Sequence, residues 1–381
     1  MRILLIHTEY KQQGGEDTVF AQERDLLIKN GFTVSTLLFN NKRYTLIKFM
    51  LLLFNPFSFI MVLKKIASFK PQVIHIHNWY FGASPSIFIA AHFKKIPVVY
   101  TMHNFRILCP SAVIFYKKEL YYDSIKKAFP IKSIFLRVYK NSFVITSWVL
   151  LCSRLHFLLN TWKNIDKIIC LTDSAKALVN ESYLKIPIDH LIVKPHFTHT
   201  KNNYFYSERK NHFLYVGRLS DEKGIELLLN TFAKNKQPLK IIGKGPLINL
   251  VQNFVEKNTN IEFLNFKTAE EVRTEMLNCS AVIFPSICYE QFGLVIVEAF
   301  ASGTPVISCD IGSPKELVKD GYNGYQFNSG NQNDLLKKIE LWQNSPENYK
   351  AMISKNAFNT YLTNYQPSSS LKILEQLYKS V

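Results

Sequence analysis

Short apolar runs alternate with amphipathic stretches along the first half of the chain. The runs are rich in β-branched residues and lack the polar alternation of a half-exposed strand, so they predict strands that are covered on both faces. These strands are Ile3–His7, Thr33–Phe39, Val73–His77, Val98–His103 and Lys167–Leu171. Helical spacing predicts helices at Gly15–Asn30 and Pro85–Lys94. Strands separated by helices indicate an α/β fold with a parallel sheet.

The second half repeats this pattern more regularly. Its predicted strands are Phe213–Val216, Leu239–Ile242, Ile261–Leu264, Ala281–Pro285 and Pro305–Ser308. Its helices are predicted to begin near Gly224, Pro246, Thr268, Phe292 and Asn331. Two doubly wound sheets are therefore expected in one chain. In such sheets ligands bind at the carboxyl ends of the strands, so the loops that follow strands are the places to look for chemistry.

The length of the chain agrees with two domains. Its 381 residues, 47% of them hydrophobic, exceed what one ordinary core accommodates. The polar stretch Thr198–Asn211 separates the two patterns and has the composition of a linker. We therefore expect a first domain at residues 1–200, a linker at 201–211 and a second domain at 212–363.

Two apolar segments raise the question of a membrane. Tyr44–Leu63 is almost wholly apolar, but Lys48 and the break at Asn55-Pro56 interrupt it, and a spanning helix needs about 20 clean residues. Two short helices are expected instead, either buried or lying in the membrane interface. Ser142–Leu159 has a similar composition.

Charge is distributed unevenly over a net +17. Residues 1–200 carry 26 Lys and Arg against 11 Asp and Glu, whereas the remainder carries 20 against 18. A basic half of this kind could face nucleic acid, an anionic membrane or a polyphosphate ligand. Six cysteines without a Cys-x-x-Cys pair indicate buried thiols in a reducing compartment. The N-terminal apolar run is too short for a signal peptide and reads as a strand, so a cytoplasmic location is expected.

Two carboxylates in the second half are candidates for chemistry. Glu290 follows a predicted strand, and Glu298 lies eight residues later inside an apolar run, where a carboxylate is costly without a partner. The helix that opens at Phe292-Gly293-Leu294 has free N–H groups that favour a phosphate. A carboxylate further along that helix could accept hydrogen bonds from a ribose diol. Alternatively, Glu298 lies on one helix face without a ligand and Glu290 is a solvated loop charge.

The residues around these carboxylates carry a resemblance. The pattern E-FGL-x3-EA-x-A-x-G-TPVI, within residues 288–318, resembles the donor-site signature of family-4 retaining glycosyltransferases of GT-B fold. Further matches are Gly14-Gly15, Gly217-Arg218-Leu219 with Glu222-Lys223-Gly224, and Gly243-Lys244-Gly245-Pro246. The stretches GGEDTVFAQERDLL and TMHNFRILCPSA are similar to a subgroup from bacterial surface-polysaccharide clusters, such as those for capsule and lipopolysaccharide O-antigen.

This resemblance implies a GT-B architecture, in which two Rossmann-like domains face each other across a cleft. The domain at residues 1–200 would lie on the acceptor side and would be completed by a C-terminal helix within 364–381. The domain at 212–363 would bind the nucleotide sugar. The family also implies transfer with retention of anomeric configuration.

Roles for individual residues follow from the same resemblance. Arg218 and Lys223 would hold the donor diphosphate, because fixed cations stabilise a departing phosphate. Glu290 would contact hydroxyls of the donor sugar, and Glu298 would bind the ribose. His103 would touch the transferred sugar at the reaction centre. Backbone groups near the substrate would come from Gly14, Gly15, Gly243, Gly245, Phe292, Gly293 and Leu294.

No metal or other cofactor is expected beyond the nucleotide-sugar co-substrate. His75 and His77 share a strand face, but no third ligand has a suitable spacing in the sequence. There is also no Asp-x-Asp motif of the metal-dependent glycosyltransferases. The segment after Cys109-Pro110-Ser111 lacks the Cys-x-x-Cys pair that is common in the subgroup, so the identity of the acceptor does not carry over.

The leading function is transfer of a sugar from a nucleotide donor to a glycan or polyprenyl-diphosphate-linked acceptor. Lysine pairs at 64–65, 94–95, 117–118 and 126–127, interleaved with aromatics, are suited to an anionic membrane. A peripheral position on the inner face of the cytoplasmic membrane is therefore expected. The alternatives are a nucleic-acid-binding basic protein, for which no motif is present, and a sugar-nucleotide epimerase of the same fold.

Overall fold

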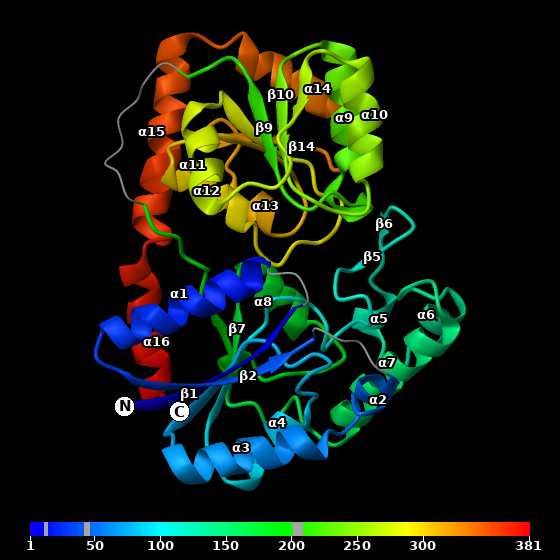
Figure 1. The fold of residues 1–381 in the computed structure, drawn as a ribbon, viewed down its shortest axis with the longest axis vertical. Coiled ribbons are helices and arrows are strands. Elements are labelled where there is room, and N and C mark those ends of the chain that lie inside the picture. The colour runs from blue at the N-terminus through cyan, green and yellow to red at the C-terminus, as the bar shows by residue number, and fades with distance from the viewer. Residues whose placement is uncertain (11–13, 42–45, 201–208) are drawn as a thin grey trace. The chain divides into compact units, whose positions relative to one another are not determined.

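The computed structural model describes residues 1–10, 14–41, 46–200 and 209–381, which form two compact units (Figure 1). Unit 1 comprises Met1–Ile114, Tyr121–His196 and Ser370–Val381. Unit 2 comprises Phe115–Leu120 and Phe197–Ser369. The predicted linker lies largely in residues 201–208, outside the described part of the chain.

Unit 1 is built on a six-stranded parallel sheet in the order β2-β1-β3-β4-β7-β8. The central strand β1 has four consecutive apolar residues, Ile3 to Ile6, that are completely buried, as expected where helices cover both faces of a sheet. The strands are β1 (Arg2–Glu9), β2 (Thr33–Asn40), β3 (Val73–Ile76), β4 (Val98–Thr101), β7 (Lys167–Cys170) and β8 (Leu191–Val193).

Helices lie on both faces of this sheet. Figure 1 shows α1 and α16 on one side, and α3 with α4 on the other. The last helix returns to the unit that contains the first strand, since the Tyr378 hydroxyl lies 2.6 Å from Nδ1 of His75 on β3. The helices of this core are α1 (Gly15–Lys29), α3 (Pro56–Phe69), α4 (Ser86–Phe93), α8 (Asp173–Asn180) and α16 (Pro367–Lys379).

Between β4 and β7 the chain forms the short helices α5 (Asp123–Lys126), α6 (Ile131–Phe135) and α7 (Phe143–Leu158) of unit 1, and α2 (Leu46–Met50) packs beside α7. The antiparallel hairpin of β5 (Phe115–Tyr116) and β6 (Glu119–Leu120), from the same stretch of sequence, belongs to unit 2. The expected break at Asn55-Pro56 is confirmed, because the Asn55 side chain accepts from the N–H groups of Phe57 and Ser58 and caps α3. Among the described residues, no helix combines the length and the apolar character needed to cross a bilayer.

Unit 2 has a second six-stranded parallel sheet, in the order β11-β10-β9-β12-β13-β14. Successive residues of β9 point to opposite faces: Phe213 packs in a core with α9, α10 and α14, while Leu214 packs in a core with α11, α12 and α15. The strands are β9 (Phe213–Val216), β10 (Leu239–Ile242), β11 (Ile261–Phe263), β12 (Ala281–Phe284), β13 (Val306–Cys309) and β14 (Gly324–Phe327). The helices are α9 (Ile225–Asn235), α10 (Ile248–Lys257), α11 (Ala269–Asn278), α12 (Leu294–Ala301), α13 (Ser313–Leu317), α14 (Gln332–Gln343) and α15 (Glu347–Asn364).

Ten strands lie where the apolar pattern predicts them, and the last strand of each sheet was missed. β8 and β14 both lie at the edge of their six-stranded sheet, and β14 includes Gly324 and Gln326, which interrupt its apolar pattern. All six cysteines are buried and free, as predicted.

Candidate functional site

The loops after β9 and β12 meet through an ion pair in unit 2. Lys223, in the short 3-10 turn that precedes α9, donates to Oε1 of Glu290. Gly224 permits this approach, because its φ is +68° and a Cβ there would lie 2.0 Å from the carbonyl oxygen of Pro285. The Ser286 hydroxyl donates to the same carboxylate oxygen at 2.5 Å. The structure thus brings together two of the residues predicted for donor binding.

Electrostatics keep Lys223 charged. Burial alone would lower the pKa of its ammonium group, but the Glu290 carboxylate beside it raises the pKa, and the net change is upward. Arg218 lies five residues earlier in the same loop, and its side chain is 66% exposed, with Nη1 4.0 Å from the Glu222 carboxylate. An exposed pair of this kind contributes little to stability, so the guanidinium is available to a ligand.

Gly243 and Gly245 hold the loop after β10 against the loop after β9. A Cβ on Gly243 would lie 1.9 Å from the carbonyl oxygen of Gly217, and one on Gly245 would lie 2.3 Å from that of Leu219. The Leu219 N–H donates to the carbonyl of Lys244 at 3.0 Å. The close contact of the two loops is by itself sufficient to require glycine at both positions.

The N-terminus of α12 presents free polar groups. Within the described residues, the N–H groups of Gly293, Leu294 and Val295 make no hydrogen bond, and Gly293 supplies no side-chain cap. Gln291, immediately before, is 5% exposed, yet neither atom of its amide has a partner there. Buried amides are nearly always hydrogen-bonded in proteins, so this corner of unit 2 has donors and an acceptor in excess.

Glu298 lies one turn further along α12. Its side chain is half-buried and makes no hydrogen bond or ion pair among the described residues, and burial raises the pKa of its carboxyl to about 7. A desolvated carboxylate without a partner is a cost to the empty protein. It is also an acceptor that a ligand hydroxyl could use.

In unit 1, polar contacts join the first turn of α1 to the strand β1. The Gly14 N–H donates to Oδ2 of Asp17 at 2.9 Å, and Oδ1 of Asp17 lies 2.8 Å from Nε2 of His7. Apart from its chain neighbours, no atom of the described residues lies within 4 Å of where a Cβ on Gly14 would be. Unlike Gly243 and Gly245, therefore, Gly14 is not required by packing against the described part of the chain.

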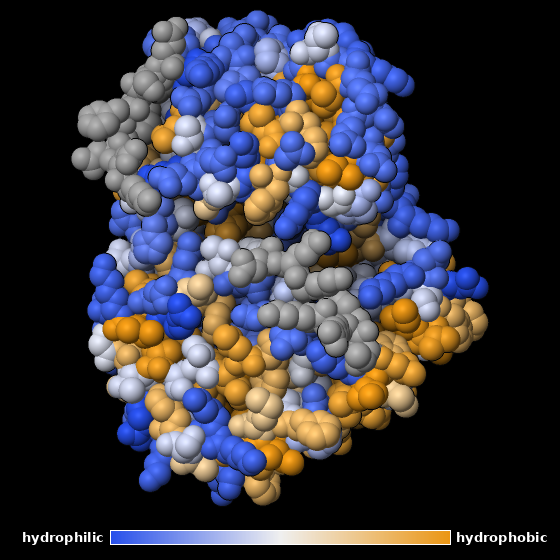
Figure 2. Space-filling model, viewed as in Figure 1, coloured by the Kyte–Doolittle hydropathy of each residue, from blue (hydrophilic) through white to orange (hydrophobic). Residues whose placement is uncertain are grey.

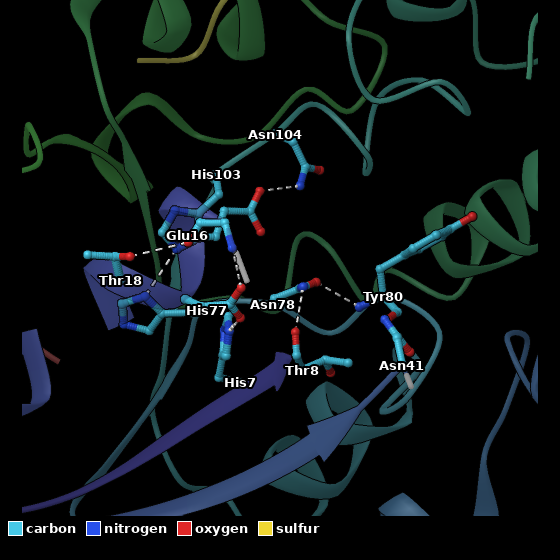
Figure 3. A network of polar contacts seen from close by, with 12 residues as sticks. His7, Thr8, Glu16, Thr18, Asn41, His77, Asn78, Tyr80, His103 and Asn104 are labelled. Carbon is cyan, nitrogen blue, oxygen red and sulfur yellow. Dashed lines mark hydrogen bonds and ion pairs between the residues drawn. The ribbon is translucent and has the colours of Figure 1, made fainter. Parts of the chain in front are cut away.

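His103 follows β4, is half-buried and contacts a line of buried side chains. Its Nε2 lies 3.1 Å from Nδ1 of His77, directly after β3, a bond that Figure 3 shows, and its ring stacks on His196 with centroids 5.0 Å apart. Oε1 of Glu23 lies 3.2 Å from the other nitrogen of His77, and Oε2 lies 2.8 Å from Nζ of Lys194. Glu23 therefore favours a proton on Nε2 of His77, which leaves Nδ1 to accept from His103.

The charge in this line resides on Glu23 and Lys194. Burial raises the pKa of Glu23, but Lys194 and then His77 lower it, and the net pKa is well below its usual value. Burial lowers the pKa of His103 well below its usual value, and His196 and His77 lower it further. His103 is consequently a neutral imidazole at physiological pH.

The sequence offers no third ligand at a suitable spacing from His75 and His77, but the fold brings Glu23 next to them. Their nitrogens and an oxygen of Glu23 all lie within 4.8 Å of one another. Glu23 belongs to α1, about fifty residues earlier, so spacing along β3 could not reveal it. These ligand atoms already have protein partners, since Lys194 binds Glu23 and the Tyr378 hydroxyl binds His75.

Sequence reasoning also missed residues that support His103. Glu23 shares the inward face of α1 with Val19, Phe20 and Leu27. A carboxylate on the apolar face of a predicted helix indicates a buried charge that needs a partner, and the sequence alone contains this pattern. Asn104, directly after His103, donates to Oε1 of Glu16 at 3.0 Å and so ties this loop to the first turn of α1 (Figure 3).

Comparison with known proteins identifies the family. Residues 2–197 match the family model described as Glycosyltransferase Family 4, and residues 197–360 match the one described as Glycosyl transferases group 1. The chain belongs to the family-4 glycosyltransferases. Solved structures agree on the GT-B fold of this glycosyltransferase. Sucrose-phosphate synthase from Thermosynechococcus elongatus aligns with a TM-score of 0.75 at 17% identity, covering 100% of this chain and 98% of that one. HepE of Anabaena, in complex with UDP-glucose, aligns with a TM-score of 0.71 at 17% identity over 100% of both chains.

Curated relatives of this glycosyltransferase include proteins of bacterial polysaccharide synthesis. An uncharacterized glycosyltransferase of Methanocaldococcus jannaschii is 36% identical over 50% of this chain and 53% of its own length. The O-antigen chain mannosyltransferase C of Escherichia coli is 30% identical over 35% of this chain and 38% of its own. A protein in the cps region of Klebsiella pneumoniae is 23% identical over 84% of this chain and 82% of its own. The match thus spans about half, or less, of the first two relatives.

Proposed function

We propose that this glycosyltransferase moves a sugar, with retention of anomeric configuration, from a nucleotide-diphosphate sugar to a glycan or polyprenyl-diphosphate-linked acceptor. The reaction would belong to bacterial cell-surface polysaccharide synthesis, of the capsule or O-antigen kind. The observation that carries the donor assignment is Glu298, a desolvated carboxylate without a partner one turn beyond free helix N–H groups.

The donor would be held through three kinds of contact in unit 2. The ribose hydroxyls would donate to Glu298, and this would offset the desolvation of the carboxylate. The diphosphate would bind the N–H groups at the start of α12 together with Arg218 and Lys223. Glu290, fixed by Lys223 and Ser286, would accept from hydroxyls of the donor sugar.

The leaving diphosphate gains negative charge as its bond to the sugar breaks. Lys223 is charged and positioned before the substrate arrives, so it would stabilise that charge without reorganisation. We propose attack on the same face as departure, with the diphosphate accepting the proton of the acceptor hydroxyl. His103, neutral and oriented by His77, would touch the transferred sugar, and the backbone at Gly14 and Gly15 would lie close to the substrate.

No divalent ion is needed in this scheme, because cations and helix N–H groups neutralise the diphosphate. The acceptor would be presented at an anionic membrane on the cytoplasmic side, where the basic first half of the chain would be attracted.

A panel of nucleotide sugars would test the proposal. One donor is expected to bind with a clear preference in calorimetry, and slow hydrolysis is expected to release a sugar with the donor's anomeric configuration, as followed by NMR. An epimerase would instead convert one nucleotide sugar into another. Binding of none of the donors, or release of the inverted sugar, would contradict the proposal.

A further inference from the structure

Exposed apolar side chains are concentrated on one part of unit 1. Of the 25 large hydrophobic side chains that are exposed among the described residues, 16 lie on five helices, α2, α3, α4, α6 and α7, and their flanks. We call this set the apolar surface: Leu46, Ile47, Met50, Phe54, Phe57, Ile60, Met61, Phe93, Phe129, Ile131, Phe135, Phe143, Val144, Leu151, Leu158 and Leu159. Monomeric proteins rarely expose contiguous apolar patches of this size without a partner.

Ring contacts join these segments to one another. Phe135 of α6 packs on Phe143 of α7 with ring centroids 6.1 Å apart, and Trp148 of α7 donates to the carbonyl oxygen of Phe49 in α2 at 2.7 Å. Further along, Phe59 of α3 lies 5.6 Å from Phe54 and 6.3 Å from Phe93 at the end of α4. Figure 2 shows hydrophobic side chains gathered along the part of the view where Figure 1 places α6, α7 and α3.

The helices that form this surface are apolar on their outer faces as well as their inner ones. In α3, Ser58, Val62 and Ile66 face the core, while Phe57, Ile60 and Met61 are exposed. In α7, the exposed Val144, Leu151 and Leu158 are each seven residues apart and therefore share one face. A surface helix normally places polar residues outward, and helices apolar all round occur in cores or in lipid.

The charge around the apolar surface has one sign. Between residues 26 and 165 the sequence has 19 Lys and Arg but only two acidic residues, Glu119 and Asp123. Lys64, Lys94 and Lys132 are exposed on α3, at the end of α4 and on α6, and none of them forms an ion pair among the described residues. A second copy of this chain would bring cations against cations, whereas anionic lipid head groups would complement them.

We propose that the apolar surface inserts into the interfacial layer of a bilayer containing anionic lipids. Phe, Leu, Ile and Met side chains would reach the acyl boundary while lysine ammonium groups remain among the phosphates. The 16 residues of α7 are too few to span the bilayer, so the helices would lie in its plane. This inference deepens the membrane part of the proposed function, on which it rests, by assigning the contact to apolar helix faces. By contrast, two lysines in the basic pairs at 117–118 and 126–127 have acidic partners, Glu226 for Lys118 and Asp123 for Lys127.

Vesicle sedimentation with matched variants tests this assignment. The test variant is Phe57→Ser, Ile60→Ser and Met61→Ser on α3. The control variant is Leu341→Ser, Met352→Ser and Leu362→Ser, which removes three comparably exposed side chains from unit 2. Wild type and control are expected to sediment with phosphatidylglycerol-containing vesicles, and the test variant is expected to partition about tenfold more weakly. A third variant, Lys64→Gln, Lys94→Gln and Lys132→Gln, should weaken binding to these vesicles and reduce its dependence on salt.

Several outcomes would overturn the assignment. They are a test variant that binds as wild type does, a wild type that binds no vesicles, and equal binding of wild type to pure phosphatidylcholine vesicles. A wild-type dimer that the test variant abolishes would show instead that a second copy covers the apolar surface. Donor hydrolysis in vesicle-free buffer separates this result from the proposed function. It should be unchanged in the test variant, and its absence from wild type would count against the reaction and not against the surface.

Discussion

Each unit is built on a six-stranded parallel sheet, but one desolvated carboxylate in each has different surroundings. In unit 1, the buried carboxylate of Glu23 has Lys194 and two histidines around it. In unit 2, Glu298 is desolvated and has no partner among the described residues, and the amide of Gln291 is in the same condition. Charges satisfied within the protein make a rigid support, whereas polar groups left unsatisfied mark where a ligand completes the structure.

The largest expected effect is a loss of stability when the charge of Glu23 in unit 1 is removed. Glu23→Gln leaves the buried Lys194 ammonium without a charged partner among the described residues, and losing one charge of a buried pair costs about 3–5 kcal/mol. The free energy of unfolding, measured with urea, should fall accordingly. The double variant Glu23→Gln, Lys194→Met should recover most of the loss, since no charge is then left alone. Unchanged stability in the single variant would show that the pair is not what supports unit 1.

In unit 2 the corresponding change should affect the reaction. Lys223→Met removes a fixed cation aimed at developing charge, and the loss of one such group costs about a hundred- to a thousandfold in rate. Steady-state transfer or donor hydrolysis measures this, with Lys234→Met, an exposed cation of α9, as the control. A Lys223 variant with normal turnover would remove the diphosphate role.

Substitution of Glu298 should have a smaller effect, which separates binding from stability: nucleotide affinity should fall while the stability of the empty protein should not. Glu298→Gln should weaken nucleotide affinity by about ten- to a hundredfold, because hydrogen bonds to a charged group contribute about 1.5–3 kcal/mol. The melting temperature without ligand should not fall. Calorimetry and thermal unfolding of the same samples test both, with Glu340→Gln on α14 as the control. Equal nucleotide affinity in a folded variant would exclude the ribose role.

The raised pKa of Glu298 also predicts a pH dependence. The folded protein holds the proton more tightly than the unfolded chain, so this group favours folding below the ordinary Glu pKa and loses that effect as pH rises through about 7. Hydrogen bonds from ribose hydroxyls are stronger to the ionised carboxylate than to the protonated carboxyl, so nucleotide affinity should fall as pH drops below about 7. Relative to Glu298→Gln, the melting temperature of wild type should fall as the pH is raised from about 5 to about 8 at constant ionic strength. Parallel curves would contradict the assigned pKa.

The smallest expected effect is that of chelation. Because Lys223, Arg218 and the start of α12 would neutralise the diphosphate, EDTA should leave turnover unchanged. Activity that is lost on chelation and restored by manganese would contradict this, and the Glu23–His75–His77 cluster would then be the first place to look for the ion.

The sequence predicted most of the fold because the buried strands are unbroken apolar runs. Glu298 could also be singled out as a candidate ligand-binding residue, because a carboxylate inside an apolar helix is costly without a partner. The same reasoning applied to Glu23, between Phe20 and Leu27 on α1, would have found the centre of the cluster in unit 1. Its partners could not be predicted, because Lys194 and Tyr378 come from distant parts of the chain and are joined to it only by the fold.

The contact of Tyr378 with His75 also constrains how the chain is made. The two residues are 303 positions apart, and Ser370, which accepts from Lys194, comes equally late. Synthesis proceeds from the N-terminus, and domains generally fold as they emerge. The core around Glu23 therefore waits until residues 370–378 have left the ribosome, by which time all of unit 2 has been synthesised. The unit that begins first finishes last, and a chain truncated before residue 370 would leave Lys194 and Glu23 without these partners.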